Sequence, residues 1–302
     1  MQNSSENFRI IQISDPHLGL RRPFFQHNWE VLVDLLNAET YDLIVCTGDM
    51  SIEGVEFEDE LAFAARQFER LRGPVVFVPG NHDVGNSLPD VRGGERLITA
   101  ARRDAYVRHF GPDFWSRDIG IGWRLIGLNS MLPGSGLGGE AEQLAMVEKA
   151  VASAAGRRLM VFKHKPFYIR MPDETVASQS ALYPEHRHRL KDALSPAGGA
   201  LICSGHIHDY KTASWDGLEQ IWAPSTAFVM DRDGLHRPIQ GIRRTGYVVH
   251  TLSGENHDHE FVEPDRFINV DLGNWMRAPE GFHALYHTEP LRGLVLDSEA
   301  SR

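Results

Sequence analysis

The chain has 302 residues, of which 42% are hydrophobic and 24% charged, with a formal net charge of −10. This acidic balance disfavours a protein that coats nucleic acid or an anionic membrane, and we expect a small ligand instead. The chain contains neither an apolar run of about 18 residues nor the basic and apolar sections of a secretory signal, which predicts a cytoplasmic protein without membrane contact.

In chain order, short apolar runs are each followed by a polar loop, and we predict them as buried strands over residues 8–14, 42–47, 75–79, 159–162 and 200–204. Between them, apolar residues recur at the spacing of a helix, which predicts helices over 28–37, 56–72, 140–155 and 184–194. Alternating strands and helices indicate an α/β fold. In such sheets, ligands bind beyond the carboxyl ends of the strands, which is where the polar loops follow.

The loops after these strands carry carboxylate, amide and imidazole groups: Asp15, His17, Asp49, Asn81, His82, Asp83, His164, His206 and His208. Two transition-metal ions need a similar supply of mixed nitrogen and oxygen donors, and one carboxylate must bridge them. We expect Gly48, Gly80 and Gly205 to let the backbone turn and approach a crowded site. One such motif is weak evidence, but five in order, each after a strand, favour a dinuclear metal centre.

The motifs D-x-H, G-D, G-N-H-D, a single H and G-H-x-H occur in this order between about Phe8 and Val249, which resembles the calcineurin-like metallophosphoesterase superfamily. The resemblance implies a four-layer α/β fold, with two mixed β-sheets sandwiched by helices, and two divalent or transition metal ions such as Mn, Fe, Zn or Co. Carried over residue by residue, it implies one ion on Asp15, His17 and His208, another on Asn81, His164 and His206, and a bridge by Asp49.

The resemblance also implies that His82 stands over the centre without binding metal. There it can protonate the leaving oxygen or stabilise the transition state, while a hydroxide shared by the cations attacks the phosphorus. We expect Asp83 to orient the His82 ring. The other nitrogen of each metal-binding imidazole normally donates to a carboxylate or carbonyl, and Asp83 and Asp209 are the nearest carboxylates in sequence.

The substrate class is left open between two branches of the superfamily. The segments LNSMLPGSGLGGEAEQLAMVEKAV and APSTAF resemble the cyclic-nucleotide and glycerophosphodiester phosphodiesterases, whereas GNHDVGN and PDETVASQSALYPEHR resemble the purple-acid-phosphatase-like branch. We favour a small phosphodiester over a monoester because the motif loops contain no compact arginine cluster to hold a dianion. A metal-stabilised, non-catalytic scaffold is a third possibility, but a scaffold has no need of His82.

The loops after the ligands, 84–94, 129–139 and 168–183, are expected to shape the pocket. Candidate substrate contacts on or near them are Asn86, Asn129, Lys165 and Glu174. Lys165 either holds a phosphate oxygen or points to solvent. A long nucleic-acid polymer is disfavoured as a partner, because the chain has no basic, aromatic-rich stretch.

We divide the chain into a catalytic domain, residues 1–250, and a C-terminal extension, residues 251–302. The extension is expected to pack on the domain or to form a contact in a homo-oligomer. It contains HDHE at 257–260, which has the spacing of a metal motif. Because these polar residues alternate after a strand-like run, we expect an exposed edge strand or hairpin there.

Overall fold

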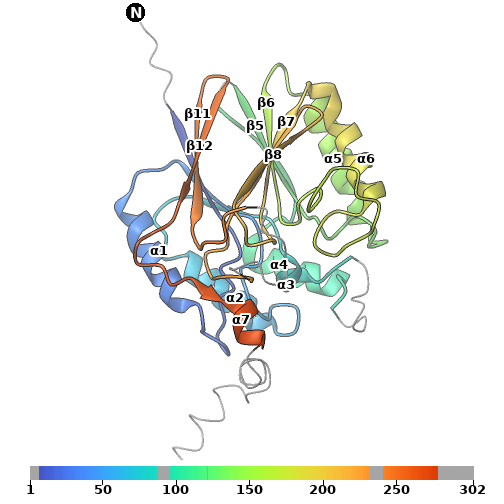
Figure 1. The fold of residues 1–302 in the computed structure, drawn as a ribbon. Coiled ribbons are helices and arrows are strands. Elements are labelled where there is room, and N and C mark those ends of the chain that lie inside the picture. The colour runs from blue at the N-terminus through green and yellow to red at the C-terminus, as the bar shows by residue number, and fades with distance from the viewer. Residues whose placement is uncertain (1–6, 88–95, 121, 232–240, 278–302) are drawn as a thin grey trace, which may run out of the picture.

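Two β-sheets form the centre of the protein in the computed structural model, which describes residues 7–87, 96–120, 122–231 and 241–277 (Figure 1). The five-stranded sheet has the order β12-β11-β1-β2-β3 and the six-stranded sheet the order β4-β5-β6-β7-β9-β8. The strands of the first sheet are β1 Phe8–Ile13, β2 Leu43–Cys46, β3 Val75–Phe77, β11 Tyr247–Ser253 and β12 Asn256–Val262. Those of the second are β4 Trp115–Ile119, β5 Trp123–Leu128, β6 Arg158–Lys163, β7 Ala200–Ser204, β8 Lys211–Trp215 and β9 Leu218–Trp222.

Helices cover the outer face of each sheet. The helices are α1 Gln26–Ala38, α2 Glu58–Phe68, α3 Asn81–Val84, α4 Ala100–Phe110, α5 Gly139–Ala152, α6 Pro184–Leu194 and α7 Leu272–Arg277, and η1 Ser195–Ala197 is a short 3-10 turn. A small third sheet pairs β10 Phe228–Val229 with β13 Val270–Asp271. In the described part of the chain, no helix has the length and apolarity to cross a membrane.

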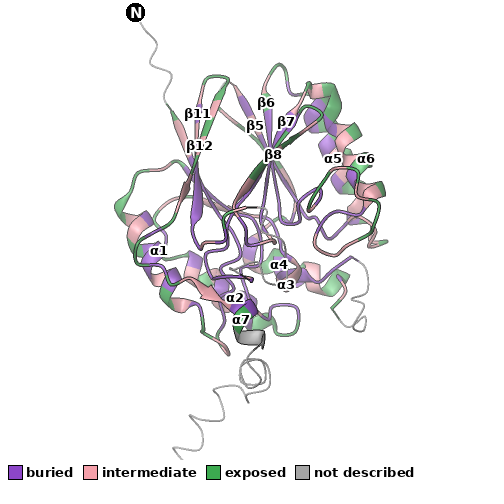
Figure 2. Cartoon of the chain, viewed as in Figure 1, coloured by how far each residue is buried: buried purple, intermediate pink, exposed green. Residues whose placement is uncertain are grey.

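Three apolar layers hold the four layers of secondary structure together. Along β1, Ile11 faces the core beneath α1 and α2, whereas its neighbour Ile10 faces the second sheet. This alternation follows from the two-residue period of a strand with both faces buried. A separate core, which includes Val161, lies between the six-stranded sheet and α5 and α6. Figure 2 shows the buried strands and the buried inner faces of these helices. The predicted α/β fold, with two mixed sheets flanked by helices, is therefore confirmed.

The strands after residue 246 belong to the main sheet. β11 pairs antiparallel with β1 and carries β12 on its other side, so a division at 250 falls inside β11. Residues 278–302 of the expected extension lie outside the described residues. β12 is an edge strand, as predicted for HDHE. On it, His257 Nε2 lies 3.0 Å from Nδ1 of the buried His250, whose Nε2 contacts Gln12 Oε1 at 3.0 Å.

Parallel pairing brings the functional loops together. β1, β2 and β3 pair in parallel, and so do β6 and β7, so within each sheet these strands end at the same edge. The segments that directly follow these five strands carry all of the residues expected in the metal centre. This edge is where an α/β sheet places its ligands.

Candidate metal centre

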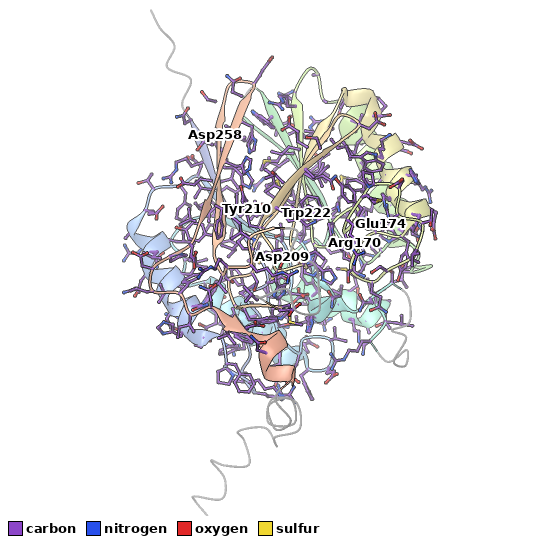
Figure 3. All side chains as sticks on the ribbon, in the orientation of Figure 1. Arg170, Glu174, Asp209, Tyr210, Trp222 and Asp258 are labelled. Carbon is purple, nitrogen blue, oxygen red and sulfur yellow. The ribbon has the colours of Figure 1, made fainter. Side chains whose placement is uncertain are left out.

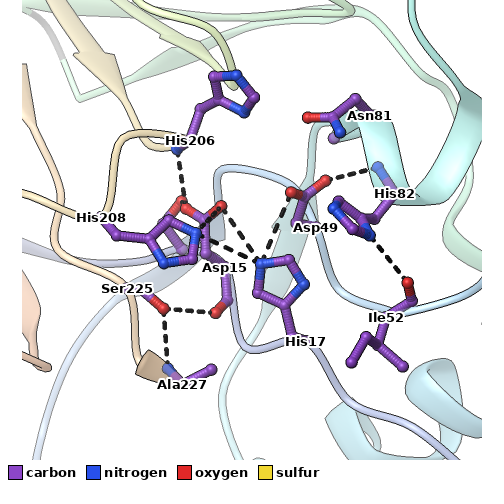
Figure 4. Close-up of polar contacts among 12 residues, drawn as sticks. Asp15, His17, Asp49, Ile52, Asn81, His82, His206, His208, Ser225 and Ala227 are labelled. Carbon is purple, nitrogen blue, oxygen red and sulfur yellow. Dashed lines mark hydrogen bonds and ion pairs between the residues drawn. The ribbon is translucent and has the colours of Figure 1, made fainter. Parts of the chain in front are cut away.

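Asp15, His17 and His208 form the first group of converging side chains (Figure 4). His208 Nε2 lies 3.2 Å from Asp15 Oδ1, and His17 Nε2 lies 3.4 Å from His208 Nε2. All three residues are buried. Asp15 Oδ1 has no hydrogen-bond partner among the described residues, although it faces both imidazoles. A carboxylate oxygen and two imidazole nitrogens that converge in this way suit a divalent cation.

A second group is formed by Asn81, His164 and His206. His164 Nε2 lies 3.1 Å from Asn81 Oδ1 and 3.0 Å from His206 Nδ1. Asp49 lies between the two groups: its Oδ2 is 3.7 Å from His17 Nε2 and 3.3 Å from His164 Nε2. One carboxylate oxygen therefore faces a nitrogen of each group, which is the arrangement that a bridging ligand requires.

The backbone of these loops is unusually compact. A Cβ on Gly80 would lie 2.0 Å from Asp49 Oδ1, and a Cβ on Gly48, whose φ is +100°, would lie 2.6 Å from His164 Nδ1. Both glycines are thus required by the close approach expected from the sequence. Five of the eight described non-glycine residues with positive φ are expected ligands: Asp15, His17, Asp49, His206 and His208. Such conformations are costly for side chains with a Cβ and concentrate at functional sites.

Backbone carbonyls, rather than carboxylates, orient the imidazoles. His164 Nδ1 donates to Thr47 O at 2.8 Å, and His208 Nδ1 donates to Phe228 O at 2.9 Å. Because a carbonyl can only accept, each ring keeps its Nε2 lone pair directed at the centre. Our expectation for Asp209 was wrong: its carboxylate pairs with Arg243 at 3.2 Å.

The expected role of Asp83 was also wrong. His82 Nδ1 contacts Ile52 O at 2.8 Å, so a carbonyl orients this ring. The buried Asp83 carboxylate instead accepts the backbone N–H groups of Ser51 at 3.0 Å and Gly80 at 2.9 Å. These N–H groups lie on the loops after β2 and β3 and have no partners in the strands, so a carboxylate between the loops satisfies both. Asp83 therefore positions the loops that carry Asp49 and Asn81.

His82 is near the centre, and one of its ring nitrogens lies within 4.8 Å of ligand atoms of both His17 and Asp49. Its backbone N–H donates to Asp49 Oδ1 at 2.8 Å, and its ring packs edge-on against His17 with centroids 4.8 Å apart. The residue is only partly buried. With Nδ1 held by Ile52, Nε2 is the nitrogen left to interact with a bound molecule.

The buried groups of the centre shift one another's pKa values. Burial raises the pKa of Asp49, but the charges of His164 and His82 outweigh it and hold this pKa well below its usual value. Burial, followed by the nearby His82, lowers the pKa of His17 to about 3. Burial also lowers the pKa of His164, but Asp49 and Asp15 outweigh it and raise the value to about 9. With this raised pKa the His164 ring carries an additional proton at neutral pH. A metal ion that binds His164 must displace that proton, since only the neutral ring can act as a ligand.

The candidate substrate contacts differ in their positions. Asn129 is fully buried and donates from Nδ2 to Asp113 at 2.9 Å, so it supports the core. Glu174 accepts backbone N–H groups of its own loop, from Ile169 at 3.0 Å and Arg170 at 2.6 Å. Figure 3 shows Glu174 beside Arg170 and apart from Asp209. The side chains of both residues form hydrogen bonds within the protein, and neither residue lines the cavities at the centre.

Lys165 points neither to solvent nor into a cavity at the centre. It is 1% exposed, and its Nζ has no hydrogen-bond partner among the described residues. Burial lowers its pKa to about 8, against the attraction of Asp49. Of the two alternatives for Lys165, exposure to solvent is excluded, because the residue follows directly on buried β6, and contact with a phosphate oxygen stays a prediction.

Two hollows meet at the centre and share Ile52, Asn81 and His82. The larger, about 260 Å³, has a mainly apolar wall: Phe24, Phe25, Ile207, Phe228, Met230 and Leu272. The smaller, about 160 Å³, has a mainly polar wall: Glu53, Glu56, Asn86, Arg96 and Gln179. Asn86 is thus the one of our four candidate contacts that lines a cavity here. Residues 88–94 of its loop lie outside the described residues.

Sequence reasoning missed the apolar wall. Its residues come from four separate segments, near Phe24, Ile207, Phe228 and Leu272, and no motif joins them. The signal that was available is local: Phe24 and Phe25 follow the D-x-H motif within ten residues. Two consecutive phenylalanines in a polar loop indicate an apolar surface that needs a partner.

Comparisons with known proteins agree with this geometry. A model of the calcineurin-like phosphoesterases matches residues 8–210. The 3',5'-cyclic adenosine monophosphate phosphodiesterase CpdA of Escherichia coli strain K12 is 27% identical over 238 residues, which cover 72% of this chain and 76% of that protein. CPPED1 of Danio rerio, a serine/threonine-protein phosphatase by name, is 26% identical over 244 residues, covering 71% and 74%. A solved dimetal phosphatase from Danio rerio has the same fold, with a TM-score of 0.58 at 12% identity over 85% of this chain and 97% of that one.

Proposed function

The chain belongs to the calcineurin-like phosphoesterase family, and from this premise we propose that it hydrolyses a small phosphodiester at a centre of two divalent cations. The observation that carries the proposal is the position of Asp49 Oδ2 between His17 Nε2 and His164 Nε2. Asp15, His17 and His208 would hold one cation, and Asn81, His164 and His206 the other. Mixed nitrogen and oxygen donors suit Mn, Fe, Zn or Co.

The donor atoms support this assignment. Among the described residues, Asp15 Oδ1 is buried without a hydrogen-bond donor, and His17 Nδ1 also has no partner. The orientation of the His17 ring therefore depends on the contacts of its other nitrogen, Nε2. An unpaired buried carboxylate oxygen is costly unless a cation neutralises it. When bound, two cations lower the pKa of a water ligand and draw electron density from the phosphoryl oxygens.

The chain's own residues then supply orientation and a proton. His82 Nδ1 donates to Ile52 O, which fixes the plane of the ring and leaves Nε2 directed to a bound ester. From that position we propose that His82 protonates the leaving oxygen as the ester bond breaks. Asp83 keeps the loops of Asp49 and Asn81 in register by accepting N–H groups from both. The carbonyls of Thr47 and Phe228 hold the imidazoles of His164 and His208.

A diester is favoured over a monoester by the state of the nearby arginines. Arg22 lines the larger hollow and pairs with Glu53 at 2.5 Å. Arg96 lines the smaller hollow and pairs with Glu56 at 2.5 Å. A monoester dianion needs more positive charge than a diester monoanion, and both arginines already have a carboxylate partner. The two hollows also offer separate space for two ester groups.

The test is turnover of bis(p-nitrophenyl) phosphate and p-nitrophenyl phosphate, measured side by side on protein supplied with Mn²⁺ or Zn²⁺. We expect kcat/KM for the diester to exceed that for the monoester. A preference for the monoester would overturn the diesterase proposal in favour of a phosphatase on the same centre. Turnover of neither ester, with metal content verified, would favour a metal-stabilised scaffold.

Removal of metal should lower the thermal stability of the protein. A ligand that binds only the folded state stabilises it by about 2.7 kcal/mol at a free concentration one hundredfold above its Kd. For a domain of this size about 1 kcal/mol corresponds to a shift in Tm of about 2–4 °C, so we expect chelation to lower Tm by at least about 5 °C. The measurement is a melting curve before and after chelation, then after metal is restored. An unchanged Tm after verified metal removal would argue against the centre.

A further inference from the structure

We propose that the substrate is an unsymmetrical phosphodiester, with an apolar ester group in the larger hollow and a hydroxyl-bearing or amine-bearing ester group in the smaller one. This inference rests on the proposed diesterase function and extends it to the chemistry of the two ester groups. It is carried by the position of His82, which lines both hollows and contacts the shared residue Ile52 at 2.8 Å. The larger hollow contains the centre, since expected ligands such as His17, Asp49 and His208 line it, and the smaller hollow adjoins it at Ile52, Asn81 and His82.

The apolar wall begins at the metal centre itself. The Phe228 ring lies 4.4 Å from that of His208 and 5.0 Å from that of His17, measured between centroids. Phe25 continues the wall at 4.8 Å from Phe228, and both pack with Leu272 in a small core of their own. This part of the wall is buried and already packed, so it needs no rearrangement to receive a ligand. An apolar group there is removed from water without an ordering cost for the protein.

Phe24 forms the outer end of the same wall. It is 40% exposed, against 4% for its neighbour Phe25. When a ligand covers a large exposed apolar side chain that lines a cavity, the burial of that apolar surface contributes favourable binding free energy. Among the described residues that line this hollow, Arg22 is the only lysine or arginine, and it is paired with Glu53. Apart from Arg22, the described lining outside His82 and the expected ligands is apolar, so a strongly hydrated ester group placed against it would lose water without a replacement partner.

The smaller hollow has the opposite character. Asn86 is 9% exposed, and its Oδ1 is buried without a hydrogen-bond partner among the described residues. An amide oxygen can only accept, so the group that satisfies it must carry an O–H or N–H. The carboxylates of Glu53 and Glu56 add acceptors to the same wall. Among the described residues that line this hollow, the only lysine or arginine is Arg96, and its charge is paired with Glu56.

The experiment compares three diesters of matched leaving groups: benzyl 3-hydroxypropyl phosphate, dibenzyl phosphate and bis(3-hydroxypropyl) phosphate. Hydrolysis is followed by phosphorus NMR on metal-supplied protein. We expect kcat/KM for the mixed ester to exceed that for either symmetrical ester by about tenfold or more, the range over which a hydrophobic pocket discriminates. A symmetrical ester that is hydrolysed as well as the mixed ester would overturn the inference.

Two variants then assign the hollows. Phe24→Ala should raise KM for the two benzyl esters by about tenfold and leave bis(3-hydroxypropyl) phosphate unchanged. Asn86→Ala should raise KM for the two hydroxypropyl esters and leave dibenzyl phosphate unchanged. Phe57→Ala is the matched control, because Phe57 is 39% exposed but lines neither hollow.

The outcomes separate this inference from the proposed function. If both variants slow all three diesters equally, the hollows do not recognise different groups and the inference fails while the diesterase function stands. If no diester is hydrolysed and p-nitrophenyl phosphate is, the diesterase function fails, and the inference with it. Circular dichroism of each variant checks that the fold is retained.

Discussion

Asp49→Asn should lower kcat/KM by about 10³-fold or more, the largest effect that we expect from a change at any of the expected metal ligands. Its Oδ2 faces His17 Nε2 and His164 Nε2, so the proposed bridge between two cations is one oxygen atom. Asparagine keeps the shape and the acceptor for the His82 N–H but removes the negative charge. Loss of several kcal/mol of charge stabilisation, at about 1.4 kcal/mol per tenfold, gives this estimate.

The measurement is kcat/KM on the preferred diester, with metal content determined for each preparation. Asp113→Asn is a suitable control, because Asp113 is also buried and pairs with Arg103 at 2.6 Å, in an ion pair separate from the expected ligands. We expect the control to lower Tm while activity per folded molecule stays near that of the parent. Activity of Asp49→Asn within tenfold of the parent would contradict the bridging assignment.

His82→Ala should leave the metal content unchanged and lower kcat by about 10²–10⁴-fold, the usual effect of removing a general acid. The loss should depend on the leaving group. An alkoxide needs the proton as the ester bond breaks, whereas a nitrophenolate leaves with little protonation. We therefore expect the alkyl diester to be slowed far more than the nitrophenyl diester. His82→Gln should behave in the same way, since glutamine can hydrogen-bond but cannot transfer a proton.

Two results would contradict this role. Equal slowing of both esters, with partial recovery in His82→Gln, would indicate that His82 only hydrogen-bonds to a phosphoryl oxygen. Loss of metal from His82→Ala would show that His82 is a ligand. Such a role is compatible with its position, because the His82 and His17 ring centroids are 4.8 Å apart. His27→Ala is a control for the loss of an imidazole, because His27 is on the exposed surface and contacts Arg266 O.

The local sequence pattern was sufficient to predict the strands that precede the ligand loops of the metal centre. β1, β2, β6 and β7 are short apolar runs that are buried on both faces, β3 is a short apolar run that is partly buried, and each is followed by a ligand loop. Because these signals are contiguous in sequence, they can be found without a structure. β8 could not be recognised in this way: it is an edge strand with alternating exposure, formed by pairing with β9 across a turn at Asp216 and Gly217.

Side-chain partners were harder to predict than positions. We expected Asp83 to contact the adjacent His82 ring, but it contacts the N–H groups of two loops instead. Lys165 follows a ligand in sequence, yet the continuation of β6 buries it. Neighbours in sequence share a loop but not a direction, so adjacency to a motif is a weak guide to contact. The apolar wall escaped prediction because it is assembled from segments about 200 residues apart, as only a tertiary fold can do.

The positive φ angles at the expected ligands have a consequence for directed evolution of this protein. Asp15, His17, Asp49, His206 and His208 hold φ angles between 43° and 72°, which glycine or asparagine adopts at lower cost. A library screened for heat resistance alone, without metal, would therefore enrich replacements at these positions, since each relieves backbone strain. The selected clones would be more robust and inactive. Selection for a more durable enzyme has to be carried out with metal present and turnover as the criterion.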